Sequence, residues 1–132
     1  MNQHPETTAI TAGRPNLTPD GALNPPVVLT STFHAGGEIG YGRYGNQTWS
    51  ALEEAIGALE GGSTLVFSSG MAAISAVFSI LPVGAPVVAS NQGYSGVMVL
   101  LNSFHESGRL EVRFVDVLDS QSVIDAMDGA AL

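Results

Sequence analysis

The sequence contains no cysteine and no lysine, and the two absences exclude several kinds of chemistry. Without cysteine, neither a disulfide framework nor a zinc site with thiolate ligands can form. Without lysine, the chain cannot complete a reaction that uses a lysine amine as its nucleophile. The four basic residues are all arginines, at positions 14, 43, 109 and 113.

Positive charge is scarce, since 12 acidic residues face four arginines and the formal net charge is -8. This balance excludes a protein that binds the phosphate backbone of nucleic acids, because no basic stripe is present. No charged residue occurs from position 61 to 104, but the most apolar run, residues 65–81, is shorter than the ~20 residues that span a bilayer. We therefore expect no membrane span. The first residues do not resemble a signal peptide, so we expect a cytoplasmic protein.

After residue 62, segments of strand-like and helix-like composition alternate. Strands are predicted over residues 64–68, 85–90 and 110–117, and helices over 71–81 and 94–108 and from residue 120 onward. This alternation is typical of an α/β fold with a parallel sheet and flanking helices.

The first part of the chain has a different composition. Residues 1–24 are polar and rich in turn formers, which predicts an extended arm with little helix or strand. Residues 25–33 are rich in β-branched side chains, but two prolines exclude their start from a central strand. Residues 34–46 hold five glycines and predict a loop. A helix follows, with Thr48 as its expected N-cap and Gly61 as its end.

The turn "SSGMA" follows the first predicted strand and begins the next helix. The free backbone N–H groups at such a position can bind a phosphate, and Gly70 has no Cβ to hold the anion away. Tight strand-to-helix turns also use glycine for packing alone. The turn by itself favours neither alternative.

Two further stretches carry side chains suited to a phosphorylated, flat ligand. Arg43 and Tyr41 lie in the glycine-rich loop, where a guanidinium and a phenol could clamp a phosphate; a surface arginine near Glu38 or Glu53 is the simpler alternative. Tyr94 follows the second predicted strand, where its ring could stack on a cofactor or cover the core. The histidines, at positions 4, 34 and 105, have no metal-ligand spacing, so no metal site is expected.

Read in order, "PPVVLTSTF", "YGRYGNQT", "LEEAIGALEGG", "FSSGMAAI" and "NQGYSG" resemble the Cys/Met-metabolism, or trans-sulfuration, family of pyridoxal-phosphate enzymes. The resemblance extends from about residue 10 to residue 132. It implies the N-terminal part of the large domain of a fold-type-I PLP-dependent transferase, preceded by an extended arm. Residues 1–47 would form the arm with a cross-subunit cofactor loop, and residues 48–132 the first part of the PLP-binding domain.

The resemblance also implies roles for particular residues. The backbone amides of Gly70 and Met71 would hold the phosphate of pyridoxal 5'-phosphate. Tyr41 and Arg43 would reach the phosphate bound by a neighbouring subunit. Tyr94 would stack on the pyridine ring and assist at the reacting carbon.

The activity that the resemblance implies is γ-elimination or γ-replacement on sulfur amino acids, of the cystathionine γ-synthase, cystathionine γ-lyase or methionine γ-lyase type. The substrate would be a sulfur amino acid or an activated homoserine, and the assembly a dimer of dimers. The alternatives are an O-acetylhomoserine sulfhydrylase and a non-catalytic fragment that only assembles with a partner. The Schiff-base lysine of the family has no counterpart in this chain, so we expect these residues to be inactive alone.

Overall fold

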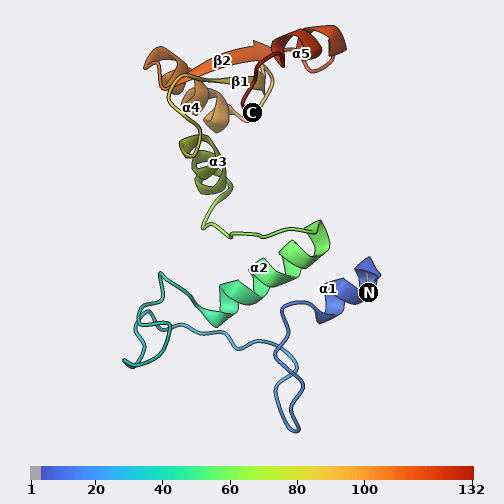
Figure 1. Ribbon diagram of the computed structural model, residues 1–132, viewed down its shortest axis with the longest axis vertical. Coiled ribbons are helices and arrows are strands. Elements are labelled where there is room, and N and C mark those ends of the chain that lie inside the picture. The colour runs from blue at the N-terminus through green and yellow to red at the C-terminus, as the bar shows by residue number, and fades with distance from the viewer. Residues whose placement is uncertain (1–3) are drawn as a thin grey trace. The chain divides into compact units, whose positions relative to one another are not determined.

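The computed structural model describes residues 4–132, which divide into two compact units (Figure 1). The first unit ends at Val66, and the second comprises Phe67–Leu132. These units are defined by packing within the chain. The functional division at residue 47 stays a prediction.

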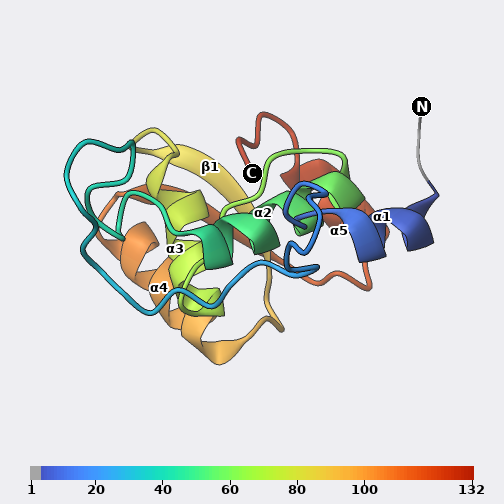
Figure 2. The same ribbon diagram turned by 90° about the horizontal axis from the view of Figure 1, so that it is seen from below.

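The second unit contains the parallel pair of strands that the sequence predicts. Strands β1 (Ala85–Ser90) and β2 (Leu110–Val115) pair in parallel, with Ala85 opposite Leu110 and Ser90 opposite Val115. Helix α4 (Ser95–Glu106) connects them and packs against one face of the pair (Figure 2). The core consists of Phe78, Ala85, Val87, Leu101, Leu110 and Val112, all buried. The predicted α/β fold class is confirmed.

Helix α3 (Gly70–Ser79) is held at its C-terminal end by Arg109. The guanidinium donates to the carbonyls of Leu81 at 2.7 Å and Pro82 at 3.0 Å, and to those of Phe78 and Ser79 at 3.3 Å. The last carbonyls of a helix have no partner within it, and a cation there also complements the helix dipole. Arg109 therefore joins the end of α3 to the start of β2.

Helix α5 (Ser120–Ala126) has side-chain hydrogen bonds at both of its ends. Asp119 caps its first turn by accepting from two backbone amides, at 3.1 and 3.2 Å. Arg113 donates to the carbonyl of Ala126, the last residue of the helix, and to that of Asp128 just beyond it. Two of the four arginines thus serve helix C-termini.

The strand predicted over residues 64–68 is wrong. These residues lie in no strand ladder within the described part of the chain, and Val66 donates its amide to the Glu53 carboxylate at 3.0 Å. An apolar run predicts a strand only where a neighbouring strand accepts its hydrogen bonds. Without that neighbour, Leu65 is 74% exposed.

Among its described residues, the first unit contains two helices, α1 (Pro5–Thr11) and α2 (Gln47–Glu60), which pack against each other. The prediction of little helix in residues 1–24 needs correction over Pro5–Thr11, whereas residues 12–24 form no helix or strand. Pro5 occupies the first turn of α1, where its fixed φ favours a helix and its missing N–H costs nothing. Gly13, just after α1, lies so close to α2 that a Cβ added there would stand 2.2 Å from the carbonyl oxygen of Ala51.

Helix α2 begins two residues earlier than predicted, because its cap is Asn46 rather than Thr48. The Asn46 side chain accepts from the Thr48 amide at 2.8 Å and donates to the Val28 carbonyl at 3.0 Å. The Thr48 hydroxyl instead bonds the Val28 amide and the Pro26 carbonyl. A cap must lie outside the helix, so Asn46 takes this role and Thr48 pins the preceding segment. The predicted end at Gly61, with φ 71°, is confirmed.

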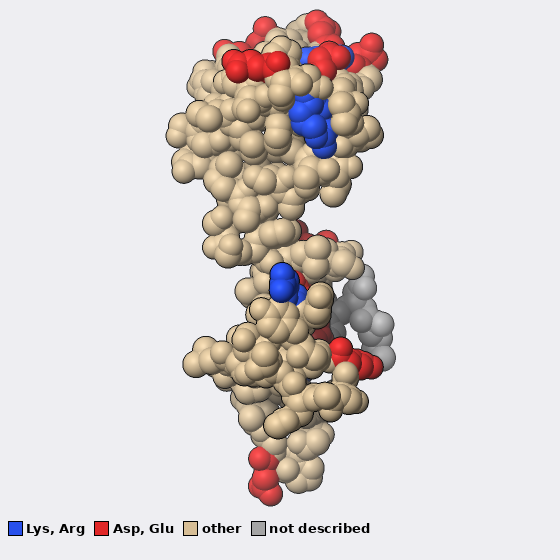
Figure 3. All heavy atoms as spheres, turned by 90° about the vertical axis from the view of Figure 1, so that its left-hand side faces the viewer, with Lys and Arg blue, Asp and Glu red and all other residues tan. Residues whose placement is uncertain are grey.

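The uncharged stretch of the sequence folds into short elements. Within residues 4–132, no helix is long and apolar enough to cross a membrane. In the second unit, the acidic side chains visible in Figure 3 gather over the end that carries β2 and α5. The α3 region of that unit displays no charged side chain on this face.

Candidate functional site

The N-terminus of α3 leaves two backbone amides without an internal partner. Ser69 caps the helix, its hydroxyl accepting from the Ala72 amide at 3.1 Å and its carbonyl from the Ala73 amide at 3.2 Å. Within residues 4–132, the amides of Gly70 and Met71 donate to no acceptor. A Cβ added at Gly70 would meet nothing within 4 Å, so there is open space beside these amides. Free helix N-terminal amides next to open space are suited to an anion.

Tyr94 lies beside this helix terminus. It is the N-cap residue of α4, makes no side-chain cap bond and is 69% exposed. A Cβ added at Gly96 would lie 2.9 Å from Cε1 of Tyr94 and 3.3 Å from Sδ of Met71. The Tyr94 ring and the Met71 side chain therefore flank the same point. The structure thus brings together Gly70, Met71 and Tyr94, three of the five residues predicted from the sequence.

The other two predicted residues, Tyr41 and Arg43, lie together in the first unit. Tyr41 forms an isolated antiparallel bridge with Thr32, which fixes the start of the turn. The guanidinium carbon of Arg43 lies 5.0 Å from the centroid of the Tyr41 ring, within the range of a cation–π contact. Tyr44 meets the Tyr41 ring edge to face, with centroids 6.2 Å apart.

The Arg43 guanidinium has no acceptor within the described residues. The alternative of a surface ion pair with Glu38 or Glu53 does not occur between residues 4 and 132. Arg109 and Arg113, in contrast, have their guanidinium groups bonded to backbone carbonyls. Arg43 thus differs from these two arginines in having N–H donors that no acceptor among residues 4–132 engages.

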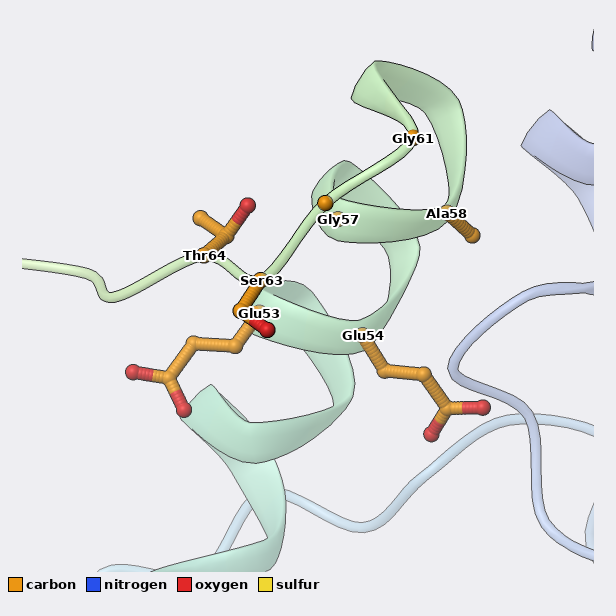
Figure 4. Close-up of a pocket in the computed structure, with 8 residues that line it drawn as sticks. Glu53, Glu54, Gly57, Ala58, Gly61, Ser63 and Thr64 are labelled. Carbon is orange, nitrogen blue, oxygen red and sulfur yellow. The ribbon is translucent and has the colours of Figure 1, made fainter.

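A hollow of ≈560 Å³ in the first unit is a poor candidate for an anion. It lies between α2 and the returning residues 61–64 (Figure 4). Its ionisable side chains are Glu53 and Glu54, and no arginine lines it. Gly57 makes the close return possible, because a Cβ there would lie 2.6 Å from the Gly62 carbonyl oxygen. Among residues 4–132, no three histidine or acidic side chains are grouped as a metal site would require.

Ser69 and Gly96 are not among the site residues predicted from the sequence. The signal for Ser69 was available, since serine directly before a helical run is a favoured N-cap. The signal for Gly96 is weaker: it is a glycine in the first turn of a predicted helix, where most other residues would stabilise the helix better. Its role depends on which side chains α3 and α4 bring to that turn.

A family profile, curated relatives and solved structures all match most of this chain. The profile of the family described as Cys/Met metabolism PLP-dependent enzyme matches residues 6–130. The cystathionine beta-lyase MetC of Bacillus subtilis is 39% identical over 109 residues, 78% of this chain. The crystal structure of cystathionine gamma synthase from Xanthomonas oryzae, in complex with cystathionine, superposes with a TM-score of 0.82 at 34% identity over 96% of the chain. A methionine gamma lyase from Micromonospora echinospora superposes with a TM-score of 0.83 at 28% identity over 98%.

The chain spans about a third of the length of these proteins. It covers 28% of the B. subtilis enzyme, 35% of the X. oryzae chain and 36% of the M. echinospora chain. The three names describe three different activities.

Proposed function

The chain belongs to the family of Cys/Met metabolism PLP-dependent enzymes, and from this we propose that it supplies the phosphate grip and the ring platform of a trans-sulfuration active site. The proposed activity is γ-elimination or γ-replacement of the cystathionine γ-synthase, cystathionine γ-lyase or methionine γ-lyase type. The substrate would be a sulfur amino acid or an activated homoserine. A dimer-of-dimers assembly and a cytoplasmic location stay predictions.

One observation carries the proposal: the two free amides of Gly70 and Met71 lie beside open space, and the Met71 side chain and the exposed Tyr94 ring border the same point at Gly96. A phosphate on a flat aromatic ring needs N–H donors and an aromatic face at neighbouring points. The residues present therefore fit pyridoxal 5'-phosphate. When bound, this cofactor would supply an electron sink for the substrate's carbanion chemistry.

Each residue has a distinct proposed task. Gly70 and Met71 would bind the phosphate through backbone N–H groups, in the field of the α3 dipole. Tyr94 would orient the ring by stacking and would hold its phenol oxygen near the reacting carbon. Tyr41 and Arg43 would add a charged clamp to the phosphate of a neighbouring copy of the chain.

The missing lysine supports a second candidate. Because the 132 residues contain no lysine, they cannot form the family's Schiff base with the cofactor. A non-catalytic chain that only assembles with a partner would not need the free amides of Gly70 and Met71 for a ligand. Phosphate binding at these amides therefore separates the two candidates.

The test uses pyridoxamine 5'-phosphate, which carries the ring and the phosphate but needs no lysine. We expect its addition to the ¹⁵N-labelled chain to shift the amide resonances of Gly70 and Met71. Pyridoxamine, the same ring without phosphate, is the control and should shift them much less. Equal shifts with the two compounds, or shifts only at other amides, would contradict the proposal.

A matched pair of variants controls for the fold. Gly70→Asp places a carboxylate where the phosphate would bind, while an acidic residue in the first turn favours the helix. Gly70→Asn adds a similar volume without charge. We expect Gly70→Asp to abolish the phosphate-dependent shifts and Gly70→Asn to weaken them less, with both variants keeping the far-ultraviolet circular dichroism spectrum of the original chain.

A further inference from the structure

Gly96 occupies the second position of α4, where glycine is not the residue that a helix prefers. The side chains of two residues, Tyr94 at the cap of α4 and Met71 in α3, border the space beside it. The point where its Cβ would stand is 2.9 Å from the Tyr94 ring and 3.3 Å from the Met71 sulfur. The first distance is shorter than a carbon–carbon contact allows, so any other residue at this position would displace the ring.

The displaced group would be a side chain and not the backbone. Tyr94 is 69% exposed and its ring makes no cap bond, so it can turn away into solvent at little cost. A merely structural glycine would lower stability when replaced, as Gly57 should, because its Cβ would meet the Gly62 carbonyl. Gly96 differs because its replacement moves a functional ring and leaves the backbone in place.

We propose that Gly96 is a positioning residue, which keeps the Tyr94 ring against Met71 so that the ring platform and the phosphate-binding amides can hold one ligand. This inference rests on the proposed function and adds a residue to it. The amides of Gly70 and Met71 are fixed by α3, whereas the Tyr94 ring is held by no hydrogen bond among the described residues. The space at position 96 is what allows the ring to lie near the side chain of Met71, at the terminus of α3 that carries these amides.

The chain offers a matched control on the other side of Tyr94. A Cβ added at Gly93 would lie 3.6 Å from Sδ of Met98 and 3.7 Å from the Ser90 carbonyl oxygen, which are ordinary contacts. Gly93→Ala and Gly96→Ala therefore add the same methyl group on either side of the same tyrosine. Only the second should move the ring.

The first measurement needs no ligand. In the unaltered chain and in Gly93→Ala, we expect nuclear Overhauser effects between the Tyr94 ring protons and the methyl group of Met71. Gly96→Ala should lose them while its thermal midpoint stays the same or rises, since alanine is the better helix former. If Gly96→Ala kept these effects, or lost them together with α4, the inference would be wrong.

The second measurement is the affinity for pyridoxamine 5'-phosphate. We expect Gly96→Ala to bind it roughly two- to tenfold more weakly, the size of one aromatic contact, and Gly93→Ala to bind it unchanged. In a Tyr94→Ala background, Gly96→Ala should have no further effect. Full affinity in Gly96→Ala, or a further loss in the Tyr94→Ala background, would overturn the positioning role.

The two proposals fail in different ways. If the unaltered chain showed no phosphate-dependent shift at Gly70 and Met71, the proposed function would fail and the positioning role with it. If the unaltered chain showed that shift and the two alanine variants had equal affinities, only the role of Gly96 would fail.

Discussion

Each of the two units of the chain is stabilised internally by a different kind of interaction. The second unit has an apolar core in which Val87 and Leu101 are each 1% exposed. Among the described residues of the first unit, the buried positions are three glycines and Asn46, and no apolar side chain is buried. The second unit is therefore stabilised mainly by the hydrophobic effect, and the first by hydrogen bonds and close backbone contacts.

The same contrast applies to the two groups of candidate site residues. The amides of Gly70 and Met71 are uncharged and belong to a helix packed on the apolar core. Arg43 is a cation in a glycine-rich loop, which is anchored by the bridge between Tyr41 and Thr32 and by Asn46. Uncharged N–H donors fixed by a helix and a charged side chain on a loop can complement each other in binding a phosphate.

The largest expected effect tests the core of the second unit. Leu101→Ala should lower the free energy of unfolding by about 2–5 kcal/mol, because it removes a buried side chain and leaves a cavity. Val99→Ala is the control on the same helix, where the side chain is 71% exposed, and should cost less than about 0.5 kcal/mol. Urea unfolding followed by circular dichroism measures both. Similar losses for the two variants would mean that this core does not stabilise the unit.

A smaller effect is expected at the polar anchor of the first unit. Asn46→Ala removes the cap of α2 and leaves the Val28 carbonyl without its donor, which should cost about 1–2 kcal/mol. Amide hydrogen exchange over residues 51–56 measures the loss locally. Gln47→Ala, one residue further along and exposed, is the control. If exchange in α2 were unchanged in Asn46→Ala, hydrogen bonding would not be what holds this unit.

The smallest effect concerns the charge that the loop contributes. Arg43→Ala should weaken binding of pyridoxamine 5'-phosphate about fivefold, corresponding to ~1 kcal/mol for one exposed ionic contact. If Arg43 reaches the ligand of a neighbouring copy, mixing Arg43→Ala with Gly70→Asp should restore tight binding at some sites. Each mixed pair would then have one site with an intact helix terminus and an intact arginine. No recovery on mixing would place both groups at the ligand of one chain.

Much of the second unit could be predicted from the sequence, because its signals are local. The segment APVVAS at residues 85–90 forms β1 as predicted, and Gly108, with φ 69°, follows the end of α4. The failed strand at residues 64–68 carries the same local signal as β1. What it lacks is a neighbouring strand, and no local pattern reports that.

The candidate site was predictable to the same degree. Tyr94 follows β1 as predicted, whereas Gly70 and Met71 follow a strand-like segment that forms no strand, and the structure still brings Met71 and Tyr94 to one point. Arg43 and Tyr41 were found from composition, as a cation and a ring in a glycine-rich loop. Asn46 was missed because Thr48 is an equally good cap by type, and only the path of residues 26–28 distinguishes them.

The close contacts at Gly13 and Gly57 have a genetic consequence. Every missense change of a glycine codon introduces a Cβ, which would stand 2.2 Å from the Ala51 carbonyl oxygen at position 13 and 2.6 Å from the Gly62 carbonyl oxygen at position 57. Conservative replacement does not exist at either position, since even alanine carries the offending atom. In a deep mutational scan, these two positions should therefore tolerate no substitution, whereas the exposed apolar residues of α2 would accept many.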